Sequence, residues 1–188
     1  MKKYISGFTI VELIIVVVII AILTTLGVAA YQGISDRSRN AQTISVAEQW
    51  YKGIEMYKAR NGSYPNAAGC LGSNYGYTVT NASSGTASDY QCRQDTALSG
   101  IKDNATLNSA LSKFVTGTPS PAMITASNST TLWKRGISYF NSNPARLDVV
   151  LDGPVSSCPA LGKITATPVT YTNGNVVCPY TLGPLNTY

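Results

Sequence analysis

GFTIVELIIVVVIIAIL, residues 7–23, decides the fold of this chain, because it places one carboxylate, Glu12, ahead of a long uncharged run. No charged residue occurs from Leu13 to Ser35. A helix crosses the hydrocarbon core of a bilayer with about 20 predominantly apolar residues, and residues 8–30 reach that length. A carboxylate without a partner in such a segment costs roughly 2.5–3.5 kcal/mol at the helix centre, and less toward one end. The sequence therefore predicts a transmembrane helix whose Glu12 requires a partner.

The segment from Gly7 to Leu23 closely resembles the processing and assembly segment of type IV pilins and of the related type II secretion pseudopilins. Gly-Phe-Thr-x-x-Glu before an apolar run carries the resemblance. It implies that a prepilin peptidase on the cytoplasmic side cleaves between Gly7 and Phe8 and then methylates the new amine of Phe8. The resemblance also implies extraction from the membrane by an assembly platform and its ATPase. The chain itself shows no ATP site.

The charges around this segment agree with the resemblance. Lys2 and Lys3 precede the apolar run, and the positive-inside bias keeps such an N-terminus in the cytoplasm. After cleavage behind Gly7, the cationic amine of Phe8 could pair with Glu12 of a neighbouring subunit. A buried charge that loses its partner costs about 3–5 kcal/mol, which is enough to set the register of docking helices. The alternative is an ordinary signal anchor in which the glutamate has no role. Such an anchor does not require Gly7, Phe8 and Glu12 together.

One helix is predicted from about Thr9 to Ala59, because no proline occurs before Pro65. Apolar residues recur in its second half at spacings of three and four, which is typical of a helix with one face on a domain: Ile44, Ala47, Tyr51 and Ile54. Asn61-Gly62 and the following proline are stop signals. The stretch YKARNGSYP, residues 57–65, is a second, weaker likeness to the segment that closes this helix in pilins.

The later half of the apolar helix departs from the family. Many major pilins have a proline there, whereas this chain has Thr24, Thr25 and Gly27. Glycine and paired hydroxyls can still loosen a helix. If the helix melts during assembly, residues 24–29 are the predicted place.

The predicted fold class is α+β, a long N-terminal helix with a three- to four-stranded antiparallel sheet packed on its amphipathic half, as in type IV pilins. The predicted segments are a leader at 1–7, a transmembrane or filament-core helix at 8–35, the amphipathic half at 36–64 and a globular domain at 65–188. Within that domain we expect a surface excursion at 67–94 with one strand at 75–80, a short helix at 104–115, and strands at 136–140 and 147–151. A hairpin is expected around Asn173-Gly174.

The four cysteines lie in the part of the chain predicted to be outside the cytoplasm, where disulfides persist: Cys70, Cys92, Cys158 and Cys178. None forms a C-x(2–4)-C pair, which disfavours a zinc site. Of the three possible connectivities, we favour Cys70–Cys92 and Cys158–Cys178. Each closes a loop of about 20 residues, worth roughly 3 kcal/mol in the loop-entropy model. Four free core thiols are the alternative.

No enzyme site, cofactor or metal site is predicted. The chain contains no histidine, which excludes Ser-His-Asp and Cys-His nucleophile arrangements. Its formal charge of +5 comes from 14 Lys and Arg against 9 Asp and Glu. Loss of Lys2 and Lys3 with the leader leaves 12 against 9, an excess of only three. Binding to DNA or to an anionic surface is therefore possible but unsupported by charge alone.

Three weaker patterns could mark binding or modification sites, but an ordinary structural explanation is favoured for each. Five aspartates could offer oxygens to calcium, but they lack EF-hand spacing and solvated carboxylates are favoured: Asp89, Asp95, Asp103, Asp148 and Asp152. Lys134-Arg135 beside Trp133 could touch a DNA backbone, but an exposed loop with a packed tryptophan is favoured. Four Asn-x-Ser/Thr sequons are expected by chance in a chain of this composition: Asn61, Asn81, Asn104 and Asn128.

The predicted function is a structural subunit, a pilin, of a type IV pilus filament that serves adhesion, motility or DNA uptake. The chain would stay in the cytoplasmic membrane, with its N-terminus inside and its C-terminal domain outside, until it joins an extracellular filament of copies of itself. Filament assembly would depend on Phe8 and Glu12. The alternative within the family is a minor pilin or type II secretion pseudopilin. The alternative of another class is a membrane-anchored binding module that never polymerises.

Overall fold

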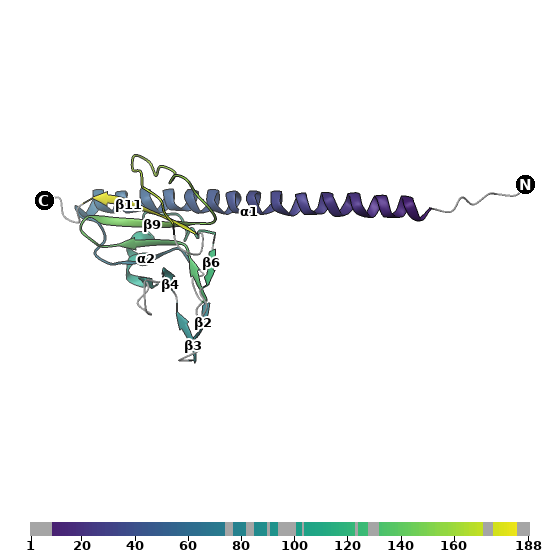
Figure 1. The fold of residues 1–188 in the computed structure, drawn as a ribbon. Helices are drawn as coiled ribbons and strands as arrows, with labels where there is room; N and C mark the ends of the chain where they lie inside the picture. The colour runs from purple at the N-terminus through teal and green to yellow at the C-terminus, as the bar shows by residue number, and fades with distance from the viewer. Residues whose placement is uncertain are drawn as a thin grey trace, which may run out of the picture. The chain divides into compact units, whose positions relative to one another are not determined.

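The computed structural model describes residues 9–73, 77–81, 85–89, 91–93, 101–102, 104–122, 124–127, 132–170 and 175–183. The chain divides into two compact units, Met1–Arg37 and Ser38–Tyr188. The first contains the N-terminal part of helix α1. The second contains the rest of α1, a short helix and all the strands (Figure 1).

Helix α1 is continuous over Ile10–Asn61, so the predicted long helix is confirmed to within two residues at each end. Its 52 residues correspond to about 78 Å at 1.5 Å per residue. The predicted stop is also confirmed. Gly62 takes a left-handed φ of 77°, and its N–H donates to the carbonyl of Lys58 at 2.8 Å. That bond satisfies one of the carbonyls that a helix end leaves without a partner.

The strands follow one another in short segments. In chain order they are β1 (Gly69–Leu71), β2 (Tyr77–Asn81), β3 (Gly85–Asp89), β4 (Gln91–Arg93), β5 (Ile101–Lys102), β6 (Ile124–Ser127), β7 (Leu132–Arg135), β8 (Ile137–Phe140), β9 (Ala145–Leu151), β10 (Val169–Thr170) and β11 (Val176–Gly183). The short helix α2 (Ala105–Leu111) lies between β5 and β6. Three two-stranded ladders, β2–β3, β4–β5 and β6–β7, accompany one larger sheet.

The main sheet is antiparallel and has the strand order β1-β8-β9-β11-β10. It has five strands, where the sequence predicted three or four. The difference is β1, which the sequence placed in a surface excursion and which pairs with β8 through Cys70 opposite Ser138. The expected hairpin is present as β10–β11, with Val169 opposite Val177, although its turn at 171–174 lies outside the described residues.

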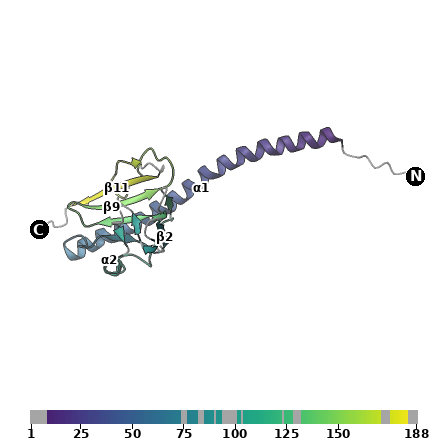
Figure 2. The same cartoon turned by 60° about the horizontal axis from the view of Figure 1, so that its bottom comes forward.

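The core lies between one face of this sheet and the C-terminal half of α1. Alternate side chains of β9 and β11 face the helix, because successive residues of a strand point to opposite sides. Figures 1 and 2 show β9 and β11 running beside this part of the helix. The largest fully buried side chains come from α1, α2, four strands and the segment after β9: Trp50, Ile54, Leu71, Leu107, Leu111, Ile137, Tyr139, Leu147, Leu151, Leu161 and Tyr180. The prediction that one face of α1 packs on the domain is thus confirmed, although Ala47, Trp50 and Ile54 are its buried residues and Ile44 and Tyr51 are only partly buried.

Over the part of the chain that the structure describes, no helix is both long enough and apolar enough to cross a membrane.

Candidate functional site

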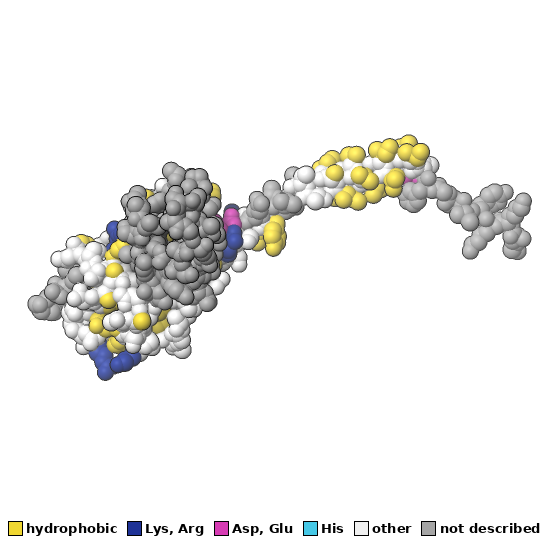
Figure 3. Space-filling view, turned by 90° about the horizontal axis from the view of Figure 1, so that it is seen from below, with side chains coloured by type: hydrophobic (Ala, Val, Ile, Leu, Met, Phe, Trp, Pro, Cys, Tyr) yellow, Lys and Arg dark blue, Asp and Glu magenta, His cyan; other side chains and the backbone are white. Residues whose placement is uncertain are grey.

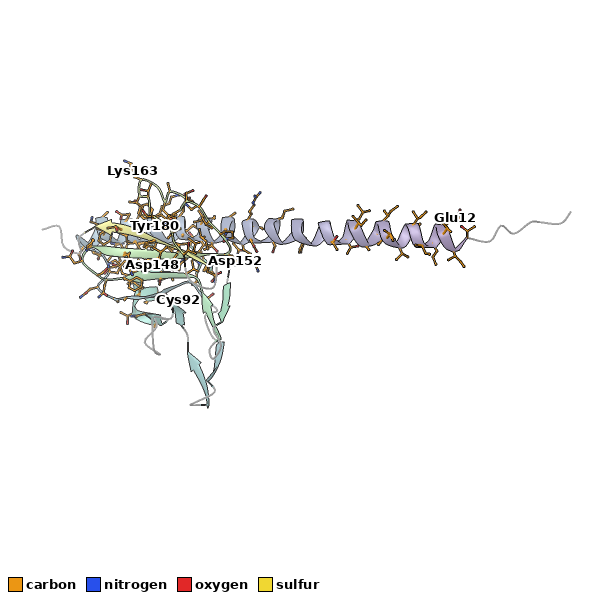
Figure 4. All side chains as sticks on the ribbon, in the orientation of Figure 1. Glu12, Cys92, Asp148, Asp152, Lys163 and Tyr180 are labelled. Carbon is orange, nitrogen blue, oxygen red and sulfur yellow. A yellow bond between two sulfur atoms is a disulfide. The ribbon has the colours of Figure 1, made fainter. Side chains whose placement is uncertain are left out.

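The first turn of α1 is closed by Thr9 and Glu12 in a reciprocal cap. The backbone N–H of Thr9 donates to Glu12 Oε2 at 2.9 Å, and the Thr9 hydroxyl donates to the same oxygen at 2.7 Å. In return the N–H of Glu12 donates to Thr9 Oγ1 at 3.3 Å. This is a capping box, in which two backbone donors of the helix start are satisfied by side chains. It holds the Glu12 carboxylate against the N-terminal end of α1 (Figure 4), where the helix dipole favours a negative charge.

Thr9 is a site residue that the sequence analysis missed. The signal was present, because Thr-x-x-Glu directly before an apolar run is the sequence form of a capping box. Glu12 itself was singled out for its charge alone. Gly7 and Phe8, the predicted cleavage and methylation residues, lie outside the described residues, so their roles stay predictions.

The surface of α1 beyond Glu12 is apolar on every side. Twelve large hydrophobic side chains between Ile10 and Leu23 are each 47–78% exposed, and Figure 3 shows them along this part of the helix. A helix that is hydrophobic all round is normally buried in protein or in lipid. The exposed apolar surface of this unit is therefore typical of a segment that lipid or protein covers.

Thr24 and Thr25 direct their hydroxyls back onto the helix. Thr24 Oγ1 donates to the carbonyl of Ile20 at 2.7 Å, and Thr25 Oγ1 donates to that of Ile22 at 2.8 Å. Such back-bonding satisfies a hydroxyl in apolar surroundings and often bends a helix. In this structure α1 remains helical through residues 24–29. Melting at that place was predicted for an assembled filament and stays a prediction.

The disulfides are Cys70–Cys92 and Cys158–Cys178, the same two pairs that the sequence favoured. The first joins β1 to β4, and the second joins the segment after β9 to β11. Both lie in the second unit, where they tie short strands and a long connection to the main sheet.

The calcium candidates divide into two groups. Asp148 was expected to be solvated, and that was wrong, because its side chain is only 1% exposed and pairs with Arg146 Nε at 2.8 Å. The reason is its place on the central strand β9, where Arg146 stands two residues away on the same face. Asp152 pairs with Arg39 at 2.8 Å. Among the described residues no group of three potential ligands could hold a metal ion. Asp89 lies in β3, whereas Asp95 and Asp103 lie outside the described residues.

The basic pair Lys134-Arg135 was expected in a loop, and that was wrong. Both residues and Trp133 belong to β7, which pairs with β6 through Thr125 opposite Lys134. A four-residue strand held by one neighbouring strand gives little alternation to recognise in a sequence.

The sequons also differ from one another. Asn104 is the N-cap of α2, as predicted, and its Oδ1 accepts from Thr106 and Leu107 at 3.0 and 3.2 Å. Asn61 is exposed at the end of α1, and Asn81 lies in β2. Asn128 lies outside the described residues.

Comparison with known proteins gives one match. Residues 2–28 match the family model of the prokaryotic N-terminal methylation motif, the signature of type IV pilins and prepilins. The match includes Gly7, Phe8, Thr9 and Glu12. No curated protein and no solved structure matches the chain. The resemblance expected from the sequence is therefore confirmed for the N-terminal segment, which supports a pilin-like or pseudopilin-type protein.

Proposed function

We propose that this chain is the structural subunit of a type IV pilus filament, cleaved after Gly7 and methylated at Phe8. The single observation that carries the proposal is the methylation motif at residues 2–28. It contains the cleavage residues and the capped Glu12 within one short segment. The motif belongs to proteins that assemble, which favours a structural role over a catalytic one.

The exposed surface of α1 supports a role in assembly. Apolar side chains cover the helix on all sides from Ile10 to Leu23. Before assembly, the lipid of the cytoplasmic membrane would cover them. In a filament, the same residues of neighbouring copies would replace the lipid, while the second unit stays outside with its two disulfides.

Glu12 would supply the register of assembly. Its carboxylate lies at the N-terminal end of α1, four residues after Phe8. The cationic amine that cleavage creates on Phe8 would pair with Glu12 of the neighbouring subunit. An apolar surface alone allows helices to slide past each other, whereas a desolvated ion pair penalises every register that breaks it, by about 3–5 kcal/mol.

The test is intact-mass and N-terminal analysis of protein sheared from the cell surface. We expect a chain that begins at N-methylated Phe8 and carries two disulfides. The processed chain found only in membranes would instead favour a minor pilin or a type II secretion pseudopilin. A chain that starts at Met1 in every fraction would refute the proposal and leave a membrane-anchored binding module.

A matched pair of variants tests the role of Glu12. Glu12→Ala should be processed normally but yield few sheared filaments. Glu48→Ala removes a half-exposed carboxylate that forms a long ion pair of 3.9 Å with Lys52, and this variant should assemble as the wild type does. Equal filament yields for the two variants would show that the pairing of Phe8 with Glu12 is not needed.

A further inference from the structure

A pocket of about 290 Å³ lies in the second unit, where the last turns of α1 meet the end of α2. None of the predicted cleavage, assembly or disulfide residues lines it. Its lining combines two aromatic rings, two cations, one amide and one small side chain: Tyr57, Arg60, Asn61, Ala110, Lys113 and Phe114.

The aromatic wall of the pocket is held by close packing of the two segments. The rings of Tyr57 and Phe114 meet edge to face, with centroids 5.7 Å apart and planes inclined by 74°. Gly53 stands one turn before Tyr57 and is buried against Val115, so that a Cβ at residue 53 would collide with the valine side chain. This close approach fixes where Phe114 stands beside α1.

The rim of the pocket is positively charged. Arg60 and Lys113 are exposed, and within the described part of the chain neither forms an ion pair. Asn61 adds an amide that is held in place by its own bond from Nδ2 to the carbonyl of Tyr57, at 2.8 Å. A concave site lined by positive charges raises the local concentration of anions.

We propose that this pocket binds a carboxylate-bearing sugar residue of an acidic polysaccharide. The guanidinium of Arg60 matches a carboxylate through two parallel hydrogen bonds, and Lys113 adds a second positive charge. The apolar C–H face of a sugar ring can pack on Tyr57 and Phe114, whose rings offer large and rigid contact area. Asn61 can exchange hydrogen bonds with sugar hydroxyls.

The size and shape of the site favour this ligand over a nucleic acid. Pockets that bind drug-sized molecules have volumes of about 300 to 1,000 Å³. At about 290 Å³ this pocket lies at the lower end of that range, which suits a ligand as small as a single sugar unit. Proteins that bind single-stranded nucleic acid offer a positive groove along the backbone, with aromatic rings for successive bases. Here the two cations surround one discrete pocket. The inference concerns the globular unit and does not depend on the proposed polymerisation.

The experiment uses the full-length chain in detergent micelles, labelled with fluorophenylalanine. The chain has three phenylalanines, Phe8, Phe114 and Phe140, so the fluorine spectrum contains one reporter in the pocket and two internal controls. Phe140 does not line the pocket, and Arg146 lies over its ring, with Cζ of Arg146 4.4 Å from the ring centroid. We expect a galacturonic acid trimer to shift the Phe114 signal saturably and to leave the other two unchanged.

Variants and competing probes decide the result. Arg60→Gln combined with Lys113→Gln should weaken binding at least about tenfold, since two charge-assisted contacts are lost. Lys163→Gln is the control, because it removes a cation that lies in the turn between Leu161 and Ile164 and does not line the pocket (Figure 4). This variant should leave binding unchanged. Ala110→Leu should narrow the pocket and weaken binding while both cations remain. An unchanged Phe140 signal in each variant reports that the domain is folded.

Four results on the Phe114 signal would overturn the proposal. They are no saturable shift of Phe114, an equal shift with a neutral galactose trimer, an equal or larger shift with inorganic phosphate or single-stranded DNA, and undiminished binding in the doubly substituted chain. A shift of all three signals would mean non-specific association and would refute it as well.

Discussion

The side chain of Asn40 on α1 and the backbone of Asp152 exchange two hydrogen bonds, as two neighbouring strands do. Asn40 Nδ2 donates to the carbonyl of Asp152 at 2.9 Å, and the N–H of Asp152 donates to Asn40 Oδ1 at 2.7 Å. The Asp152 carboxylate also pairs with Arg39, the residue before Asn40. Two consecutive helix residues thereby fix the point where the chain leaves β9 toward Cys158. The long connection to β10 is thus anchored to the helix at its start as well as by its disulfide.

Asn40→Ala should lower the free energy of unfolding of the second unit by about 1–3 kcal/mol, because it leaves two partly buried backbone groups of Asp152 without their partners. Gln49→Ala is the control, since Gln49 is exposed on the same helix and makes only a local bond of 3.4 Å. Urea unfolding of the full-length chain, followed by tryptophan fluorescence, measures both. Equal midpoints for the two variants would mean that the anchor at residue 152 contributes nothing.

Two glycines of α1 should respond to alanine in opposite directions. Gly53→Ala would drive a Cβ into Val115, and overpacking of this kind costs about 1–3 kcal/mol. Nothing lies within 4 Å of a Cβ at Gly33, so Gly33→Ala should only strengthen the helix, by roughly 0.5–1 kcal/mol. The helix content and the urea midpoint of each variant measure the two effects. Val115→Ala should restore part of the stability that Gly53→Ala loses, and a double variant as unstable as the single one would contradict the collision.

Local patterns in the sequence predicted what depends on local chemistry. The bounds of α1 follow from its apolar spacing and from Asn61-Gly62, and the cap of α2 follows from Asn104. The β10–β11 hairpin follows from two β-prone runs around Asn173-Gly174. The N-terminal motif is equally local, which is why both the sequence and the family comparison identify it.

Features made by distant residues could not be read from the sequence. β1 has three residues and exists because β8 pairs with it, 68 positions later between Cys70 and Ser138. Asp148 is buried because β9 is central in the sheet, a fact that depends on the strand order. The pocket beside Tyr57 requires residues 57–61 and 110–114 to meet. No periodicity within either segment indicates the other.

The two disulfides should differ in their reactivity toward a reductant under native conditions. Cys70, Cys92 and Cys178 are fully buried, whereas Cys158 is partly exposed. Thiol–disulfide exchange requires access to a sulfur, so Cys158–Cys178 should be reduced first. Mass spectrometry of alkylated peptides during mild reduction measures the order. Simultaneous reduction of both bonds would indicate that reduction occurs only through global unfolding.

The cap at the start of α1 should depend on the hydroxyl of Thr9. Thr9→Val removes the acceptor for the N–H of Glu12 and the donor to Glu12 Oε2, and loss of an N-cap costs about 0.5–2 kcal/mol of helix stability. Amide exchange at residues 10–13 of the full-length chain in micelles should therefore accelerate. Thr24→Val, which removes a hydroxyl bonded only to Ile20 within the same helix, should leave those amides unchanged. Equal exchange in both variants would show that the cap does not stabilise the first turn.

The stability of the second unit should fall at alkaline pH, and Tyr180 should contribute to the fall. Burial raises the pKa of Tyr180 from 10.0 to about 12, and its hydroxyl donates to the carbonyl of Pro159 at 2.5 Å. Burial also raises the pKa values of Tyr64 and Tyr139. Between pH 10 and pH 12 the unfolded chain has therefore lost protons that the folded chain retains, so the free energy of unfolding decreases as pH rises. Below pH 10 both states hold the proton and this contribution is complete.

Tyr180→Phe keeps the buried ring and removes the titrating group. Its loss of one hydrogen bond should lower the stability at pH 8 by about 0.5–1.5 kcal/mol. Between pH 10 and pH 12, however, its free energy of unfolding should decline less steeply with pH than that of the wild type. The reason is that the variant releases up to one proton fewer on unfolding. Urea midpoints at pH 8, 10 and 11 measure both effects, with Tyr31→Phe as the control because that side chain is 74% exposed. Parallel pH profiles for Tyr180→Phe and the wild type would show that Tyr180 ionises alike in the folded and unfolded chains.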